Sequence, residues 1–294
     1  MTTITIRKLV DSVKPGRLLS VGLPLCLALV LSGPSLLKAD LISTVDSTNP
    51  LAYFRLESAN SSSEVGGYTT TYQNGASVGS PGVATGEPSN NYVSLNNASQ
   101  QYVSTSLSGG VNTAGSLMAW VNLAALPSSG GAYWYIAGES QVGNDFDLQF
   151  QTDNNVYFYS AAGSAVSYAP NSSSLVDQWH MVVATFNATT DTQDIYWDGT
   201  LVSTGSVGSN TNKQGAFWIG ASSVFGGRYL DGGIDEVAVW NYDLSAAQVS
   251  AIYDSAPLGP PVSGAPEPGT NLLMGAGLVG IAFALRRRKS ASAV

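Results

Sequence analysis

Acidic side chains are the residues of this chain best suited to chemistry, and four of them form two close pairs. Asp145 and Asp147 are two residues apart, whereas Asp235 and Glu236 are adjacent. Retaining cleavage of a glycosidic bond needs an acid and a nucleophile about 5–5.5 Å apart, both facing the bond. Alternate side chains of a strand share a face, but adjacent ones do not. Only Asp145 and Asp147 can therefore share a face. No third carboxylate accompanies this pair, so the spacing does not predict an enzyme.

Histidine and cysteine offer little further chemistry. His180 is the single histidine, so a site with several histidine ligands is impossible, and a Ser-His-Asp triad would have to use it. It follows Trp179 at the start of an apolar run, which predicts a packing role. Cys26 is the single cysteine and lies in an apolar stretch near the N-terminus. If that stretch is removed, the protein has no thiol for a disulfide, a metal site or catalysis.

Asp235 is a candidate metal ligand. Strand alternation predicts that it shares a face with Val237 and Val239. A carboxylate among apolar side chains needs a compensating cation or hydrogen-bond donors. Arg55 could supply this compensation, as could a calcium ion bound by Asp235, Glu57 and main-chain carbonyl groups. The sequence leaves both an ion pair or capping role and a calcium site open.

Aromatic side chains are the candidates for binding a sugar. Tyr157 and Tyr159 are two residues apart on one predicted strand. Trp134 stands between Tyr133 and Tyr135, directly after a glycine-rich loop. Flat rings can stack on the apolar faces of sugars, while neutral neighbours such as Asn154 and Asn155 can bind hydroxyl groups. The same rings suit the core between two sheets or cross-strand pairs, and this interpretation is favoured because aromatic cross-strand pairs are common in sheets. Both interpretations stay open at this point.

The charge of the chain excludes one class of partner. Residues 40–265 contain 18 acidic residues but only three basic ones, Arg55, Lys213 and Arg228. A surface this acidic cannot neutralise phosphate groups, so nucleic acid is not an expected partner. Cations and neutral polymers are compatible with it.

The elements that must position these residues are short strands joined by turns. The 32 glycines and the low charged fraction of 11% suit tight turns better than long helices. From residue 245 the pattern changes, because Ser245 and Gln248 have the spacing of a helix capping box. Twelve strands exceed an immunoglobulin sandwich and predict an all-β jelly roll of two packed sheets. They are expected at residues 52–56, 92–95, 101–105, 116–121, 133–137, 146–151, 156–160, 180–187, 194–197, 201–204, 217–220 and 234–240.

Several of these segments resemble the LamG-like, concanavalin A-like jelly rolls. The resemblance lies in residues 50–57, 116–121, 179–186, 195–202 and 233–241, in the order that the family has them. It implies a concanavalin A-like sandwich over residues 40–255, in which calcium is frequent but its ligands vary. Hydrolytic members use Glu-x-Asp-x-x-Glu on one strand, and that spacing does not occur here. The resemblance therefore favours a non-catalytic module that binds glycan. The alternatives are a structural or adhesion protein of the extracellular matrix that binds other proteins, and a divergent glycoside hydrolase.

The N-terminal 39 residues have the three parts of a secretory signal peptide. Basic residues Arg7, Lys8, Lys14 and Arg17 precede an apolar core at 18–31, and Ala39 offers a cleavage site before Asp40. The apolar core is shorter than the roughly 20 residues of a membrane span. We expect export with cleavage of residues 1–39, and an uncleaved anchor is the alternative.

The C-terminus has the order of a sorting signal. A proline-rich linker at 256–265 leads into Pro266-Glu267-Pro268, an apolar stretch at 271–285, and Arg286, Arg287 and Arg288. This order over residues 266–290 resembles the PEP-CTERM signal of Gram-negative bacteria that make exopolysaccharide. The resemblance implies processing by a membrane protease of the exosortase type. We expect a transient tether at the inner membrane through a single hydrophobic helix, then transfer to the cell envelope, outer surface or extracellular matrix, with polysaccharide as a candidate partner.

Overall fold

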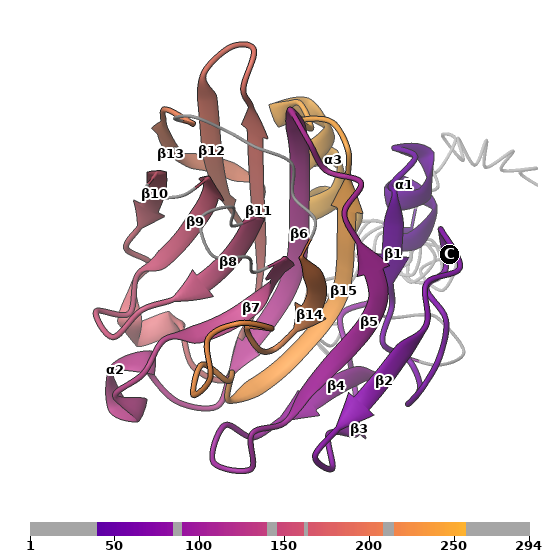
Figure 1. The fold of residues 1–294 in the computed structure, drawn as a ribbon, viewed down its shortest axis with the longest axis vertical. Coiled ribbons are helices and arrows are strands. Elements are labelled where there is room, and N and C mark those ends of the chain that lie inside the picture. Colours follow the sequence, from indigo (N-terminus) through magenta and orange to yellow (C-terminus); the bar gives the residue numbers. More distant parts are fainter. Residues whose placement is uncertain (1–39, 85–89, 140–145, 162–163, 208–214, 257–294) are drawn as a thin grey trace, which may run out of the picture. The chain divides into compact units, whose positions relative to one another are not determined.

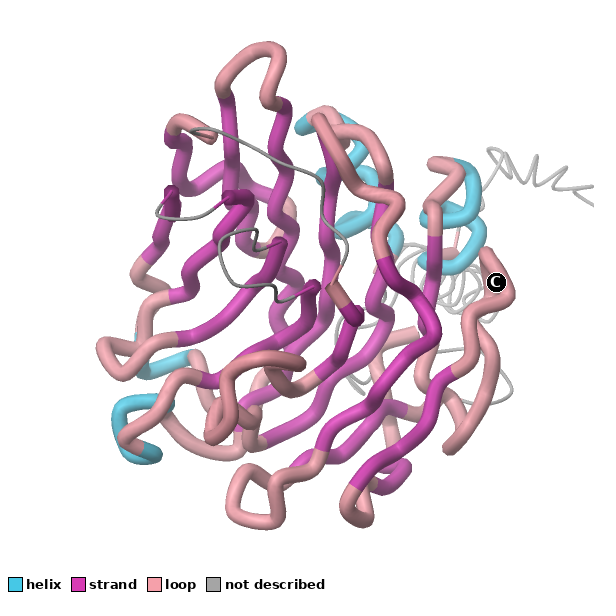
Figure 2. Tube along the Cα trace, in the orientation of Figure 1, coloured by secondary structure: helices cyan, strands magenta, loops and turns pink. Residues whose placement is uncertain are grey.

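A computed structural model of the protein describes residues 40–84, 90–139, 146–161, 164–207 and 215–256. All of them lie in one compact unit of the chain, Lys38–Val294. They form two β-sheets that face each other, together with a few short helices (Figures 1 and 2). This arrangement confirms the predicted all-β, two-sheet sandwich. The predicted signal segment, the linker beyond residue 256 and the C-terminal hydrophobic helix lie outside the described residues.

One sheet has seven strands in the spatial order β10-β9-β8-β7-β14-β5-β2. Its middle joins segments far apart in the sequence, because β14 lies between β7 and β5 and is antiparallel to both. The strands are β2 (Thr70–Gln73), β5 (Tyr102–Ser108), β7 (Trp134–Glu139), β8 (Phe146–Phe150), β9 (Val156–Ala161), β10 (Ser164–Tyr168) and β14 (Ala216–Ile219).

The other sheet has eight strands in the order β13-β12-β11-β6-β15-β4-β3, with β1 also paired to β15. A hairpin turn at Asp198 and Gly199 joins β12 to β13, and both residues have the positive φ angles, 49° and 77°, that such turns need. The strands are β1 (Ala52–Phe54), β3 (Ser77–Gly79), β4 (Tyr92–Leu95), β6 (Ala114–Leu123), β11 (Trp179–Asn187), β12 (Thr192–Trp197), β13 (Thr200–Gly205) and β15 (Gly232–Trp240).

The main core lies between the two sheets. Most strands direct alternate apolar residues into it, and the ring of Phe54 stacks on that of Phe217 in the opposite sheet at 6.1 Å. Phe146, Phe158 and Phe186 form a second cluster of mutual ring contacts across the sandwich. Burying one such side chain contributes about 1.5–3 kcal/mol, so these rings are a large part of what holds the sheets together.

A second core lies on the outer face of the eight-stranded sheet, beneath two helices. Helix α1 (Leu41–Ser47) and helix α3 (Ala246–Ser255) pack their apolar side chains against Trp120, Trp240 and neighbouring residues of that sheet. The predicted capping box of α3 is present, with Ser245 and Gln248 each binding the other's backbone N–H. The short helices α2 (Pro127–Gly130) and η1 (Ser172–Ser174) lie in connecting loops.

Each of the twelve predicted strands corresponds to a strand of the structure, with ends that differ by up to three residues. Strands β2, β3 and β10 were not predicted, because they are short and rich in exposed or partly exposed polar residues. Helix α1 was not predicted either. Its apolar face consists of the buried Leu41 and Val45 and the partly buried Ile42, which is too short a pattern to reveal a helix in the sequence.

Candidate functional site

The outer face of the seven-stranded sheet carries partly exposed aromatic rings. Tyr102 of β5 and Trp218 of β14 stack at 4.4 Å between ring centroids, and Tyr229 lies 6.2 Å from Tyr102. All three rings are partly exposed, whereas the strand neighbours Phe217 and Ile219 point into the core. Strand alternation therefore places the Tyr102 and Trp218 rings on the side of the sheet that faces away from the sandwich core.

A second pair of rings lies on the same face, on β9. Tyr157 and Tyr159 stack at 6.4 Å, and both are partly exposed, because Val156 and Phe158 take the inward positions. The Tyr157 hydroxyl donates to Asp153 at 2.8 Å, which fixes the orientation of that ring. Two of the three residues predicted to bind sugar thus lie side by side on an outer surface.

Trp134, the third predicted sugar-binding residue, does not lie on that surface. It is 1% exposed and belongs to the core between the sheets, so its ring has no face available for stacking on a ligand. Its cross-strand partner Phe150 also points inward, and a bulge follows on β7 between Tyr135 and Ala137. The prediction for Trp134 is wrong, because the aromatic run alone does not reveal which ring the pleat turns inward.

A positive charge adjoins the aromatic face. Arg228 lies in the loop between β14 and β15, with its guanidinium carbon 4.3 Å from the Phe225 ring centroid and 4.8 Å from that of Tyr133. It also donates to the Tyr135 hydroxyl at 3.4 Å, and that hydroxyl donates to Asp147 at the same distance. Stacking on several rings holds the guanidinium in place. The sequence offered one signal for Arg228, namely that it is one of only three basic residues between residues 40 and 265.

The structure changes the prediction for Asp235. Strand β15 has a register shift after Asp235, where Glu236 adopts a positive φ of 51°. This bulge adds one residue, so Val237 and Val239 point into the main core, while Asp235 lies opposite Trp120 on the other face. The predicted shared face of Asp235 with the two valines is therefore wrong, since regular alternation does not hold across a bulge.

The protein itself satisfies the carboxylate of Asp235. Its two oxygens accept hydrogen bonds from the backbone N–H groups of Val83 at 2.9 Å and Glu236 at 3.0 Å. The side chain is fully buried, and burial, followed by the adjacent Glu236 charge, raises the pKa of Asp235 well above its usual range. The sequence left two ways open to compensate this buried carboxylate: an ion pair or capping role, and a calcium ion. In the structure, backbone N–H donors cap it.

Glu57 and Arg55 belong to a network next to Asp235. Arg55 contacts Glu57 at 3.0 Å and Glu236 at 3.8 Å, and Glu236 also accepts from the Tyr53 hydroxyl. The other carboxylate oxygen of Glu57 accepts from the backbone N–H of Asn91 at 2.9 Å. A cation at this position would have to displace an arginine and several donors. Across the described ranges, no group of three or more acidic, histidine or cysteine side chains is arranged to hold a metal. The geometry does not fit calcium at Glu57 and Asp235, and that site stays an untested prediction.

His180 has partners that suit a structural role. One ring nitrogen lies 2.8 Å from a carboxylate oxygen of Asp198, and the other lies 2.8 Å from the backbone oxygen of Ser174. A triad would place a serine hydroxyl at the second nitrogen, where a backbone carbonyl lies instead. Burial by itself would lower the pKa of His180, but these two hydrogen bonds outweigh it and raise the pKa above 6.5.

The predicted carboxylate pairs show no catalytic arrangement. Asp147 is fully buried at 0% exposure, and Asp145 lies outside the described residues. Asp235 and Glu236 are fully buried as well and hydrogen-bond to protein groups. No side chain of these pairs that the structure describes is accessible to a substrate bond.

Two family models match the sequence. One, described as the concanavalin A-like lectin/glucanases superfamily, matches residues 89–250. The other, described as the PEP-CTERM protein-sorting motif, matches residues 265–289 and confirms the predicted sorting signal. That motif implies processing by an exosortase-type system and indicates export and sorting to the cell surface or envelope. Its residues lie outside the described ranges. Within those ranges, no helix has the length and apolar composition to cross a membrane.

Solved structures with a similar fold are mainly binding domains. The receptor binding domain of botulinum neurotoxin D is 12% identical, with 70% of this chain and 52% of that chain covered and a TM-score of 0.52. The neurotoxin serotype D ligand binding domain in complex with N-acetylneuraminic acid is 13% identical, with coverages of 73% and 52% and a TM-score of 0.53. Domain 4 of an extracellular arabinanase from Geobacillus stearothermophilus, in complex with arabinotriose, is 15% identical, with coverages of 69% and 98% and a TM-score of 0.51.

At these identities the likeness concerns the fold alone, and this chain spans about half the length of the neurotoxin domains. No curated protein sequence matches the chain. The superfamily model extends over more than half of the residues and covers most of the two-sheet sandwich. Sequence match and fold agree, and the chain belongs to the concanavalin A-like lectin/glucanases superfamily.

Proposed function

We propose that the protein is a non-catalytic glycan-binding module that is exported and sorted to the envelope or matrix. The observation that carries this proposal is the set of stacked, partly exposed rings on the outer face of the seven-stranded sheet. The pairs Tyr102–Trp218 and Tyr157–Tyr159 form its two ends. Within each pair the two rings cover one face of each other, and the outer ring faces can stack on sugar units of an extended chain.

Polar groups beside the rings support a neutral polymer as the ligand. Gln73 donates to the Ser104 hydroxyl at 3.0 Å next to the first ring pair, and Gln151 donates to the Tyr159 hydroxyl at the second. Amides and hydroxyls of this kind can exchange hydrogen bonds with sugar hydroxyls. The surplus of acidic residues disfavours strongly anionic polymers.

Absence of catalysis is part of the proposal. The superfamily includes glucanases. In this chain, however, the described members of the two close carboxylate pairs, Asp147, Asp235 and Glu236, are buried and hydrogen-bonded within the protein. The arabinanase domain that the fold resembles is bound to arabinotriose, which supports sugar binding by this architecture. A glycoside hydrolase is therefore the weaker alternative.

Adhesion to another protein has less support. The large apolar side chains that are exposed in the described ranges are Val78, Leu201 and Val224, which lie on different elements. Protein-binding surfaces usually present a contiguous apolar patch, and three separate side chains do not form one.

Before processing, we propose, the apolar stretch 271–285 tethers the chain at the inner membrane, so that the domain is released only after export is complete.

Glycan-array binding of the processed protein, with calcium and with chelator, tests the proposal. We expect selective binding of neutral glycans, and Trp218→Ala should weaken it by about tenfold or more because one stacking surface is lost. Leu201→Ala, an exposed change on β13 away from the aromatic face, is the control and should bind as the wild type does. A folded protein that binds no glycan in either condition would overturn the proposal, and loss of binding with chelator alone would revive a calcium site.

A further inference from the structure

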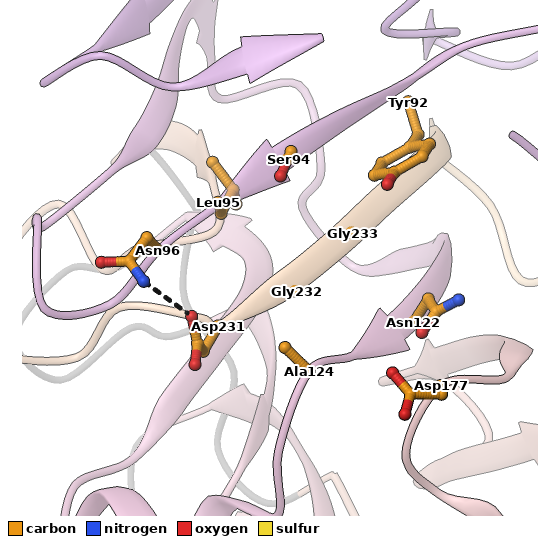
Figure 3. Close-up of a pocket in the computed structure, with 10 residues that line it drawn as sticks. All are labelled: Tyr92, Ser94, Leu95, Asn96, Asn122, Ala124, Asp177, Asp231, Gly232 and Gly233. Atoms are coloured by element: carbon orange, nitrogen blue, oxygen red, sulfur yellow. Dashed lines mark hydrogen bonds between the residues drawn. The ribbon is translucent and has the colours of Figure 1, made fainter. Parts of the chain in front are cut away.

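A pocket of about 380 Å³ lies on the opposite side of the sandwich from the aromatic face. It opens beside the outer face of the eight-stranded sheet, where β4 and β6 end and β15 begins, and Figure 3 shows the residues that line it. The second core beneath α1 and α3 occupies another part of the same face. The proposed glycan surface uses none of the residues of this pocket.

The floor of the pocket is bare backbone. Gly233 lies between Ser94 of β4 and Asn122 of β6 in the sheet. A side chain at Gly233 would come within 2.9 Å of the Tyr92 ring and 3.0 Å of the Trp179 ring, so only glycine leaves room for both. Gly232 has a φ of 142°, and a side chain there would collide with the backbone oxygen of Asn122. Two consecutive glycines therefore keep this part of the sheet flat and open.

One wall of the pocket is a fixed aromatic ring. Tyr92 contacts the ring of Trp179 edge to face, with centroids 5.2 Å apart and an interplanar angle of 77°. This contact braces Tyr92 above Gly233, at one end of the pocket (Figure 3). A ring held in place by a neighbour loses little conformational entropy when a ligand stacks on it.

The remaining walls are polar. Asn96 donates to Asp231 at 3.3 Å at the end away from Tyr92, while Asn122 and Asp177 line a third side (Figure 3). The lining contains two carboxylates and no lysine or arginine, which disfavours phosphate, sulfate and acidic sugars. The carboxylates do not form part of a metal-binding group within the described ranges.

We propose that this pocket binds a single neutral sugar unit. The size lies near the lower end of the range of small-molecule sites, about 300–1,000 Å³, and suits one ring rather than a chain. The Tyr92 ring provides the stacking surface. The amide and carboxylate groups of Asn122, Asp177 and Asp231 provide hydrogen bonds to hydroxyls, with the glycine floor allowing close approach.

A consequence follows if the proposed function also holds. The domain then has two sugar sites on opposite outer faces, and one molecule can join two polysaccharide chains. This consequence rests on the proposed aromatic site, whereas sugar binding in the pocket does not. Cross-linking of this kind raises the overall strength of attachment without any additional contact at either site.

Saturation-transfer NMR of the processed protein tests the pocket. Trp218→Ala serves as the parent, so that the aromatic face contributes less signal. The probes are glucose, galactose, mannose, xylose and arabinose, with glucuronic acid and N-acetylneuraminic acid as anionic comparators. We expect at least one neutral sugar to bind and both acids to bind more weakly. Binding of no neutral sugar to the folded protein, or preference for the acids, overturns the pocket proposal.

Two variants locate the binding. Asn122→Ala, added to the parent, should weaken binding by about tenfold through loss of its hydrogen bonds to the sugar. Asn96→Ala should weaken binding as well, because Asp231 loses the amide donor that holds its carboxylate at the pocket. Asn96 is an exposed lining residue, so its variant stays informative if Asn122→Ala does not fold. Asn241→Ala, an equally exposed change beyond the end of β15, is the matched control and should leave binding unchanged. Equal binding in all folded variants overturns the assignment.

Agglutination of beads coated with dextran, xylan or arabinan separates the two proposals. We expect beads that the wild type clusters to bind, but not to cluster, with either Trp218→Ala or Asn122→Ala. If only Trp218→Ala impairs attachment and clustering, the pocket proposal fails and the proposed function stands. If only Asn122→Ala impairs them, the aromatic face fails and the pocket stands.

Discussion

His180 shows how one residue's surroundings decide its titration. Burial opposes its protonated form, but the carboxylate of Asp198 and the backbone oxygen of Ser174 favour that form more strongly, so its pKa lies above 6.5. A histidine whose pKa is raised in the folded state contributes to the free energy of unfolding, and this contribution is complete below pH 6.5. It is lost as the pH rises through the folded-state pKa. The free energy of unfolding should therefore fall between pH 6.5 and the raised value.

Asp198→Asn should lower the pKa of His180 and flatten this loss of stability, because burial then dominates. The amide keeps an acceptor for the backbone N–H of Met181, which donates to Asp198 at 3.0 Å, so the turn is preserved. NMR titration of the imidazole protons measures the pKa directly, since the chain has one histidine. Glu64→Gln, an exposed change in the loop between β1 and β2, is the control. An unchanged midpoint in Asp198→Asn would contradict the assigned cause.

Residue identity predicted part of the site. Tyr157 and Tyr159 were predicted together because alternate residues of a strand share a face, and the structure places both on the outer sheet face. Asp235 was misplaced because a bulge on β15 shifts the alternation after it, whereas Trp134 was misplaced because the aromatic run does not reveal which ring points inward. Arg228 was not predicted as a site residue, because only the folded loop brings it over Tyr133 and Phe225.

At the scale of elements, helix α3 depends on its N-terminal cap. Ser245→Ala removes the side-chain acceptor for the backbone N–H of Gln248 and should cost about 0.5–2 kcal/mol of unfolding free energy. Ser250→Ala, at an exposed position of the same helix, should cost less. Urea unfolding of the two variants measures the difference. Equal stability of both would mean that packing of α3 on Trp120 and Trp240, rather than its cap, holds the helix in place.

The strands were predictable to the extent that their sequences show an alternating or continuous apolar pattern. Strands β4 and β9 alternate between buried and partly exposed residues and were predicted within one residue of their ends, while β6, β11 and β15 are buried along almost their whole length. Strand β3 has no buried residue and β2 has one, so neither carries an apolar signal. Their positions are decided by pairing with β4 and β5, which is a tertiary effect that a single segment of sequence does not contain.

At the scale of the whole molecule, the segments that resemble LamG-like jelly rolls predicted the fold better than any single residue predicted the ligand. Several segments in a fixed order specify a sandwich, because each fits only one place in the two sheets. A binding surface depends instead on which side chains meet on an outer face, and a neutral ligand leaves no charge signature in the composition. The pocket beside Gly233 had no motif in the sequence, since its residues come from four separate segments.

The charge distribution makes a final prediction about the whole domain. With 18 acidic residues and three basic ones between residues 40 and 265, binding that relies on stacking and neutral hydrogen bonds should hardly respond to salt. A neutral polymer releases no condensed counterions, so affinity at about 50 mM and about 500 mM salt should agree within about twofold. A steep loss of affinity with salt would instead indicate an acidic glycan that pairs with Arg228. Arg228→Gln, measured by titration calorimetry with the same glycan, distinguishes the cases, because it should abolish a salt-dependent component and leave a neutral one in place.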